Sequence, residues 1–170
     1  NQTDDKGHSA LSNAVRYNSP EAVSFLLNQG ASVAPEDNGG VLLQGLATAF
    51  KRDSAAFHEK TGLLMAQQFD LSSPQADGNT LFHLAITEGN TGLCMIASQH
   101  GTDVNHLNSE GYSALHLAAM QAEGADIITT LLNLGAKTDA LTPFGETPLV
   151  LAKENERLSN LPSIFNLLQP

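Results

Sequence analysis

The stretch Gly111-Tyr112-Ser113-Ala114-Leu115-His116-Leu117-Ala118-Ala119 decides the fold, because its pattern recurs along the 170 residues at a nearly fixed period. The copies align on their first glycine, and successive glycines lie 32, 39, 33 and 34 residues apart. Repetition at this period is typical of arrays in which each copy is one small folding unit. The anchoring glycines are Gly7, Gly39, Gly78, Gly111 and Gly145.

Most copies contain two apolar stretches with helical spacing. Residues three and four positions apart lie on one helical face. A glycine follows the second stretch in three copies, where the left-handed backbone after a helix end favours glycine. One helix pair cannot bury its own apolar face, but stacked pairs cover one another. We therefore expect stacked antiparallel helix pairs with an extended turn between pairs, closing glycines at Gly30, Gly101 and Gly135, and a core that includes Leu11, Ala14, Leu26, Leu115, Ala118, Leu131 and Leu149.

These motifs resemble the ankyrin repeat family, whose pattern runs D-x-x-G-x-T-P-L-H-x-A-A-x-x-G and then V-x-x-L-L-x-x-G-A-D-V-N. The chain has Gly78-Asn79-Thr80-Leu81-Phe82-His83-Leu84-Ala85 and Gly101-Thr102-Asp103-Val104-Asn105. The resemblance implies an all-α ankyrin-repeat solenoid of stacked antiparallel helix pairs with projecting β-hairpin-like turns. It implies one domain over residues 1–170, with repeats at about 4–36, 37–74, 75–107, 108–141 and 142–170.

Copy two departs from the family pattern. It holds about six extra residues near Lys51 to Ala56, and Gln68 replaces the closing glycine. Phe50 and Phe57 flank the two cations Lys51 and Arg52, so the insertion is either a lengthened helix or a functional loop. Copy five has about three extra residues at 159–162 and resembles a C-terminal cap.

Composition narrows the range of partners. The net charge is −10 with only eight Lys and Arg, so we expect neither nucleic acid nor anionic membrane as a partner, but a protein with a basic or neutral surface. No membrane span or signal peptide is evident in the sequence. Cys94 is the only cysteine, which agrees with a reducing compartment, the cytoplasm or nucleus, or the host cytosol for a secreted bacterial effector. The sequence starts at a repeat boundary, so we expect a segment of a larger protein.

Few residues suggest catalysis. His83 and His116 could bind a metal, but each occupies the family's T-x-x-H position, where an imidazole can hydrogen-bond between turns. Cys94 lies in an apolar helix and favours a buried structural thiol. Asn105 favours a role in tying a turn. We therefore expect no enzyme activity, no cofactor and no metal.

The resemblance also implies a binding surface on the concave side, formed by turn tips and exposed inner-helix positions. Aromatic and methionine side chains there are favoured as interface anchors. Alternatives are a substrate-recruiting segment of a larger enzyme, a secreted bacterial effector, or a self-associating spacer; we expect a monomer in isolation. The candidate partner-binding residues are Arg16, Tyr17, Asp77, Asn79, Glu88, Glu110, Tyr112, Met120, Gln121, Phe144 and Glu146.

Overall fold

The structure is a computed structural model that describes residues 2–5, 8–34 and 41–169. The predicted anchors Gly7 and Gly39 lie outside the described residues. The chain divides into two compact units, residues 1–76 and 77–170, which are described separately. This division falls within two residues of the predicted boundary between copies two and three, while the single domain over 1–170 stays a prediction.

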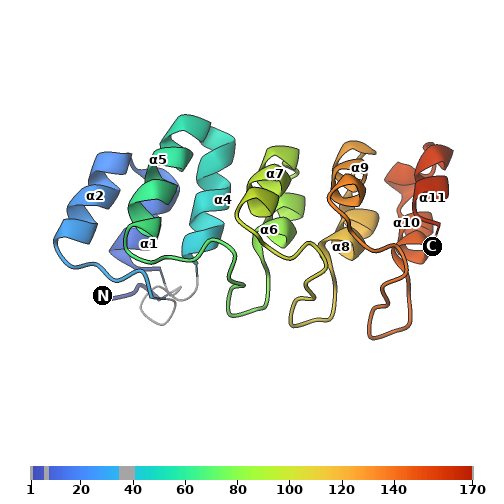
Figure 1. The fold of residues 1–170 in the computed structure, drawn as a ribbon, viewed down its shortest axis with the longest axis horizontal. Coiled ribbons are helices and arrows are strands. Elements are labelled where there is room, and N and C mark those ends of the chain that lie inside the picture. Colours follow the sequence, from blue (N-terminus) through green and yellow to red (C-terminus); the bar gives the residue numbers. More distant parts are fainter. Residues whose placement is uncertain (1, 6–7, 35–40, 170) are drawn as a thin grey trace. The chain divides into compact units, whose positions relative to one another are not determined.

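Unit 1 contains two helix pairs. The first pair is α1 (Ala10–Tyr17) and α2 (Pro20–Asn28), and the second is α4 (Leu42–Arg52) and α5 (Ser54–Met65). Helix α1 packs on α4 and α2 packs on α5, so the pairs stack in register (Figure 1). The shared core is apolar, with Val15, Val23, Leu46, Phe57 and Leu64 fully buried.

The insertion in copy two lengthens both helices of its pair. Helices α4 and α5 have 11 and 12 residues, whereas α1 and α2 have 8 and 9. Asp53 is the single residue between α4 and α5, and its carboxylate accepts hydrogen bonds from the N–H groups of Ala55 and Ala56, each at 3.0 Å. The rings of Phe50 and Phe57 meet edge to face with centroids 5.0 Å apart. The lengthened-helix interpretation is therefore confirmed.

Gln68 takes the place of the closing glycine after α5. Its φ is 66°, and it is the one non-glycine residue with positive φ among those described. The Gln68 N–H donates to the Met65 carbonyl at 2.9 Å and the Phe69 N–H donates to the Leu64 carbonyl at 3.2 Å. These bonds satisfy the last carbonyls of the helix, as a glycine-closed end would.

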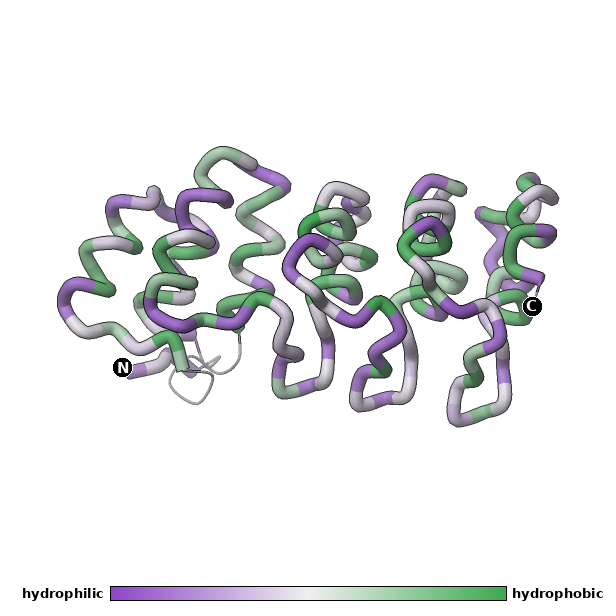
Figure 2. The backbone as a smooth tube through the Cα atoms, viewed as in Figure 1, coloured by the Kyte–Doolittle hydropathy of each residue, from purple (hydrophilic) through white to green (hydrophobic). Residues whose placement is uncertain are grey.

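Unit 2 contains three further helix pairs. Helices α6 (Leu81–Thr87), α8 (Ala114–Gln121) and α10 (Pro148–Glu154) pack side by side, and α7 (Thr91–Gln99) packs on α9 (Asp126–Asn133). The chain ends with a 3₁₀ helix (Glu156–Leu158) and α11 (Pro162–Leu167). Figure 2 shows hydrophobic stretches in every helix pair, interrupted by hydrophilic residues. Because the described residues form helices and a single isolated β-bridge, the all-α prediction is confirmed.

The predicted core is buried except at two positions. Leu11, Ala14, Leu115, Ala118 and Leu131 are at most 1% exposed. The expectation that Leu26 and Leu149 are also buried is wrong, because both are half-buried. They lie in the first and last helix pairs of the sequence, which a neighbouring pair covers from one side only.

Candidate protein-binding surface

Two projecting turns of unit 2, those at Gly111 and Gly145, are each held by one side chain three residues before the glycine. The Asn108 side-chain oxygen accepts hydrogen bonds from the N–H groups of Glu110 and Tyr112 at 3.1 and 3.0 Å. The Thr142 hydroxyl accepts from residues two and four positions further on, at 3.3 and 3.2 Å. Sequence reasoning missed these two residues, although the family pattern D-x-x-G contains their position. They fix the turn backbone before any partner arrives.

Adjacent turns of unit 2 are also tied to one another. The Ser109 N–H donates to the Asp77 carbonyl at 3.0 Å, and the Asn108 side-chain amide donates to the Asn79 side-chain oxygen at 3.0 Å. A Cβ atom on Gly78 would lie 2.6 Å from the Ser109 nitrogen, closer than atoms can approach. The turns therefore lie side by side as a close-packed row (Figure 1).

Two buried histidines join each turn to the following one. In His83, Nδ1 accepts the Thr80 N–H at 3.1 Å and Nε2 donates to the Tyr112 carbonyl at 3.0 Å. His116 makes the equivalent two bonds one repeat later, both at 3.1 Å. Burial lowers the pKa of both imidazoles, which are neutral in this arrangement. The predicted turn-ordering role is confirmed, and within the described residues no three His, Cys, Asp or Glu side chains are placed to hold a metal ion.

The surroundings of Asn105 and Cys94 also indicate structural roles. The Asn105 side chain donates to the Gly135 carbonyl at 3.2 Å and accepts from the Lys137 N–H at 2.9 Å, so it ties two turns together. Cys94 is fully buried, and burial raises the pKa of its thiol to about 12. A thiol with so high a pKa is a poor nucleophile at neutral pH.

The apolar candidates of unit 2 differ in exposure. Phe144 is 79% exposed at the tip of its turn, and Met120 is 43% exposed near the end of α8 beside the exposed Gln121. Tyr112 is half-buried, with its ring 6.2 Å from that of His116. Phe144 and Met120 therefore present more free apolar surface than Tyr112 does.

Among the polar candidates, hydrogen bonds within the turns engage most side chains. Asp77 accepts from the N–H and side-chain amide of Asn79 at 2.9 and 2.7 Å, and Glu146 accepts from the Thr142 hydroxyl at 3.2 Å. Glu88 is half-buried at the end of α6 and interacts within the chain. Glu110 is exposed at its turn. The turn surface of unit 2 is thus acidic around an aromatic tip.

Sequence reasoning missed two exposed apolar residues in the same turns. Leu107 is 46% exposed and Leu141 is 57% exposed, each a few residues before an anchoring glycine. The signal for them was available, since an apolar residue in a turn that helix packing does not require points to a contact elsewhere.

In unit 1, the candidates Arg16 and Tyr17 are the last two residues of α1. Tyr17 is 58% exposed, and the Arg16 guanidinium carbon lies 5.9 Å from the centre of its ring. Arg52, the last residue of α4, approaches the same ring at 5.6 Å. Both distances are typical of cation–π contacts.

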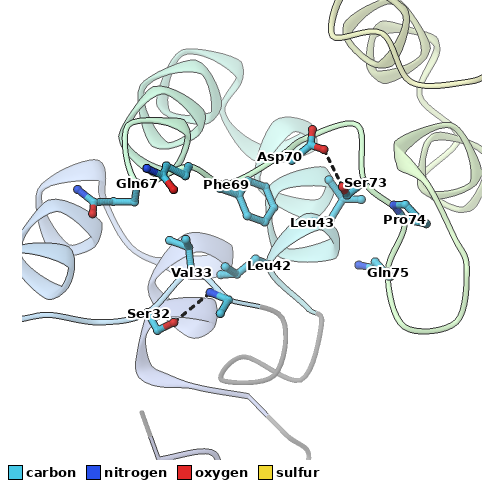
Figure 3. Close-up of a pocket in the computed structure, with 12 residues that line it drawn as sticks. Ser32, Val33, Leu42, Leu43, Gln67, Phe69, Asp70, Ser73, Pro74 and Gln75 are labelled. Carbon is cyan, nitrogen blue, oxygen red and sulfur yellow. Dashed lines mark hydrogen bonds between the residues drawn. The ribbon is translucent and has the colours of Figure 1, made fainter.

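Unit 1 also contains a pocket of about 400 Å³ (Figure 3). Its walls are largely apolar, with Val33, Leu42, Leu43 and Phe69 among them. The carboxylate at its edge, Asp70, accepts hydrogen bonds from two neighbouring serines at 2.6 to 2.9 Å, which lower its pKa.

Over residues 2–5, 8–34 and 41–169, no helix combines the length and apolar character needed to cross a membrane.

Comparison with known proteins identifies the repeats. A family model for three copies of the ankyrin repeat matches residues 53–141, and a single-repeat model matches residues 6–34. The residues between these matches belong to the degenerate second copy. Neurogenic locus notch homolog protein 1 is similar to this chain: 34% identical over 152 residues in Homo sapiens and 33% over 152 residues in Xenopus tropicalis.

Each similarity covers 89% of this chain and 6% of the relative, so the chain spans a small fraction of those proteins. The matched models cover more than half of the chain and include α1, α2 and the helices from α5 to α9. The chain therefore belongs to the ankyrin repeat family.

Proposed function

We propose that this chain is a non-catalytic protein-recognition module and that its partner contacts the turn tips and the last turns of α8 and α10 in unit 2. Ankyrin repeats are in general protein–protein interaction modules. The observation that carries the proposal is the exposure of Phe144 (79%) on a turn whose backbone is already fixed by Thr142. An exposed aromatic on a rigid support loses little conformational entropy on binding.

The net negative charge of unit 2 supports a partner that presents a basic surface. Residues 77–170 contain ten Asp and Glu against three Lys and Arg, a net charge of −7. Glu110 places a carboxylate in the turn of the exposed Leu107, and Glu146 places one in the turn of the exposed Phe144. A positively charged partner would be attracted to this surface, with the apolar tips providing the contact area.

The proposal can be tested with two matched double variants. Met120→Ser/Phe144→Ser removes apolar surface from α8 and the turns, whereas Met95→Ser/Leu167→Ser removes comparable surface from α7 and α11, where the two side chains are 48% and 50% exposed. Proteins captured from lysate by the wild-type chain would be identified and their binding measured with purified components.

We expect the first variant to lose at least about tenfold in affinity, as for interface anchors, and the second to bind as the wild type does. Loss confined to the second variant would place the site on α7 and α11 and refute the proposal. Melting curves of both variants check that each remains folded.

A further inference from the structure

The cations of this acidic chain are concentrated in unit 1. Residues 1–76 contain five of the eight Lys and Arg, and four of these lie on three neighbouring helices. Arg16 ends α1, Lys51 and Arg52 end α4, and Lys60 lies in α5. The remaining three cations of the chain are in unit 2. The region around the ends of α1 and α4 is therefore locally basic, against the charge of the whole molecule.

Both arginines approach an aromatic ring, and among the described residues neither forms an ion pair with a carboxylate. The guanidinium carbons of Arg16 and Arg52 lie 5.9 and 5.6 Å from the centre of the Tyr17 ring. Among the described residues, the ion pairs are His8–Asp4 and Arg157–Glu123, and neither includes these two arginines. A stacked guanidinium keeps its N–H donors in its own plane, where they can bind a carboxylate in bidentate fashion.

At the end of α1, a buried cation already stabilises the helix terminus. Cations near a helix C-terminus are favourable, and buried Lys60 serves that purpose in α1 by donating to the Val15 carbonyl at 2.9 Å. Burial, and next the nearby charge of Arg52, lower the pKa of Lys60, and the Asp53 carboxylate opposes this shift only in part. Arg52 thus adds positive charge where another cation already lies, and a bound anion would relieve that repulsion.

The cluster depends on the insertion in copy two. Helix α4 is three residues longer than α1 or α8, and its last two residues are the exposed Lys51 and Arg52. The aromatic residues of the insertion pack between α4 and α5, whereas its cations are exposed, and Arg52 lies beside Tyr17. A helix of ordinary length would end before these residues.

We infer that the Arg16–Tyr17–Arg52 cluster binds an acidic peptide segment of a partner protein, with carboxylates on the two guanidinium groups and an apolar side chain on the tyrosine ring. This inference rests on the proposed role in protein recognition, but it concerns a different surface. A short acidic segment fits better than nucleic acid, because a few carboxylates match the three exposed or half-exposed cations, whereas the phosphates of a longer backbone would extend over the rest of a chain of net charge −10.

The test is fluorescence anisotropy at low ionic strength with a labelled peptide of glutamates around a central leucine. The variant Arg16→Gln/Arg52→Gln removes two charges from the cluster, and the control Lys137→Gln/Lys153→Gln removes two from exposed positions in unit 2. We expect the first to weaken binding about tenfold or more and the control to leave it unchanged. Arg52→Gln alone, at an exposed position, gives a second variant with less effect on folding.

Three outcomes would overturn the inference: no binding of the peptide to the wild type, equal losses in both double variants, or tighter binding of an oligothymidylate than of the peptide. Partner capture through unit 2 is measured separately, with the Met120→Ser/Phe144→Ser variant. A chain that captures partners but ignores the acidic peptide refutes only this inference, whereas a chain that captures nothing contradicts the proposed function.

Discussion

At the scale of single residues, Gln68 keeps a glycine's backbone conformation with a side chain attached. Its φ of 66° lies in the left-handed region, where a Cβ atom costs roughly 1–2 kcal/mol. We therefore predict that Gln68→Gly raises the free energy of unfolding by about 0.5–1 kcal/mol, partly offset by the greater freedom of glycine in the unfolded chain. Urea unfolding followed by circular dichroism measures this change.

Gln67 provides the matched control, because it is an exposed glutamine one residue earlier and its φ is not positive. Glycine at this position relieves no strain and only increases the freedom of the unfolded chain, so Gln67→Gly should destabilise the protein by about 0.5–1 kcal/mol. If both substitutions lower stability equally, the left-handed backbone at residue 68 is not a source of strain.

The sequence could predict the left-handed glycines but not this exception. Gly30, Gly101 and Gly135 have φ values of 83°, 76° and 90°, as their position after a helix predicts. At residue 68 the local preference of glutamine opposes that conformation. Packing decides, since Leu64 before this helix end and Leu71 after it are both buried and fix the direction in which the chain leaves the helix.

At the scale of elements, two glycines allow the energetic effect of packing one turn on the next to be measured apart from the effect of backbone conformation. Gly78 and Gly145 have nearly equal φ values, 77° and 78°. A Cβ atom on Gly78 would lie 2.6 Å from the Ser109 nitrogen, whereas one on Gly145 would meet no atom within 4 Å. Both substitutions to alanine carry the conformational cost, but only one also forces two turns apart.

We predict that Gly145→Ala costs about 1 kcal/mol of unfolding free energy and that Gly78→Ala costs clearly more, on the order of 2–4 kcal/mol with the displaced backbone included. Thermal and urea unfolding of the two variants would measure the difference. Equal losses would mean that the turn at Gly78 is not closely packed on the turn at Ser109 in solution.

The insertion in copy two shows what the sequence alone could not predict about the helices. The count of residues revealed the extra segment near Lys51, but both a loop and two longer helices fit that count. The ring centroids of Phe50 and Phe57 lie 5.0 Å apart, a contact that supports two longer helices. It joins residues seven positions apart on two different helices. Such a contact depends on the helix pair being formed, so no local pattern predicts it.

At the scale of the whole molecule, charge is distributed unevenly along the chain. Residues 1–76 have a net charge of −3 and residues 77–170 have −7, and the cations of the first unit cluster near Tyr17. The acidic total follows directly from the sequence, and the partner-binding role of the turn candidates stays a prediction. The sequence could not predict which turn side chains hydrogen-bond to a neighbouring turn, such as Asn79, whose side-chain oxygen accepts from the Asn108 amide, because such bonds form only when neighbouring turns stack.

The same stacking makes the stability of the molecule depend on pH through His83 and His116. Burial lowers the pKa of both imidazoles and outweighs the nearby carboxylates of Asp77 and Glu146, which favour the charged form. A proton on Nδ1 would also break the bond that this atom accepts from the helix start. In the unfolded chain, histidine titrates near its ordinary pKa of about 6.5.

The unfolded chain therefore takes up protons at a higher pH than the folded chain. The contribution of the two neutral histidines to the free energy of unfolding is fully present above about pH 6.5. It decreases as the pH falls below that value, by at most about 1.4 kcal/mol per pH unit for each histidine. We predict this loss in urea unfolding between about pH 7.5 and 5.5. The variant His83→Asn/His116→Asn should be less stable at neutral pH and nearly independent of pH, whereas His58→Asn/His100→Asn, at exposed positions, should retain the wild-type dependence. A wild-type slope that persists without the two buried histidines would assign the pH dependence to other groups.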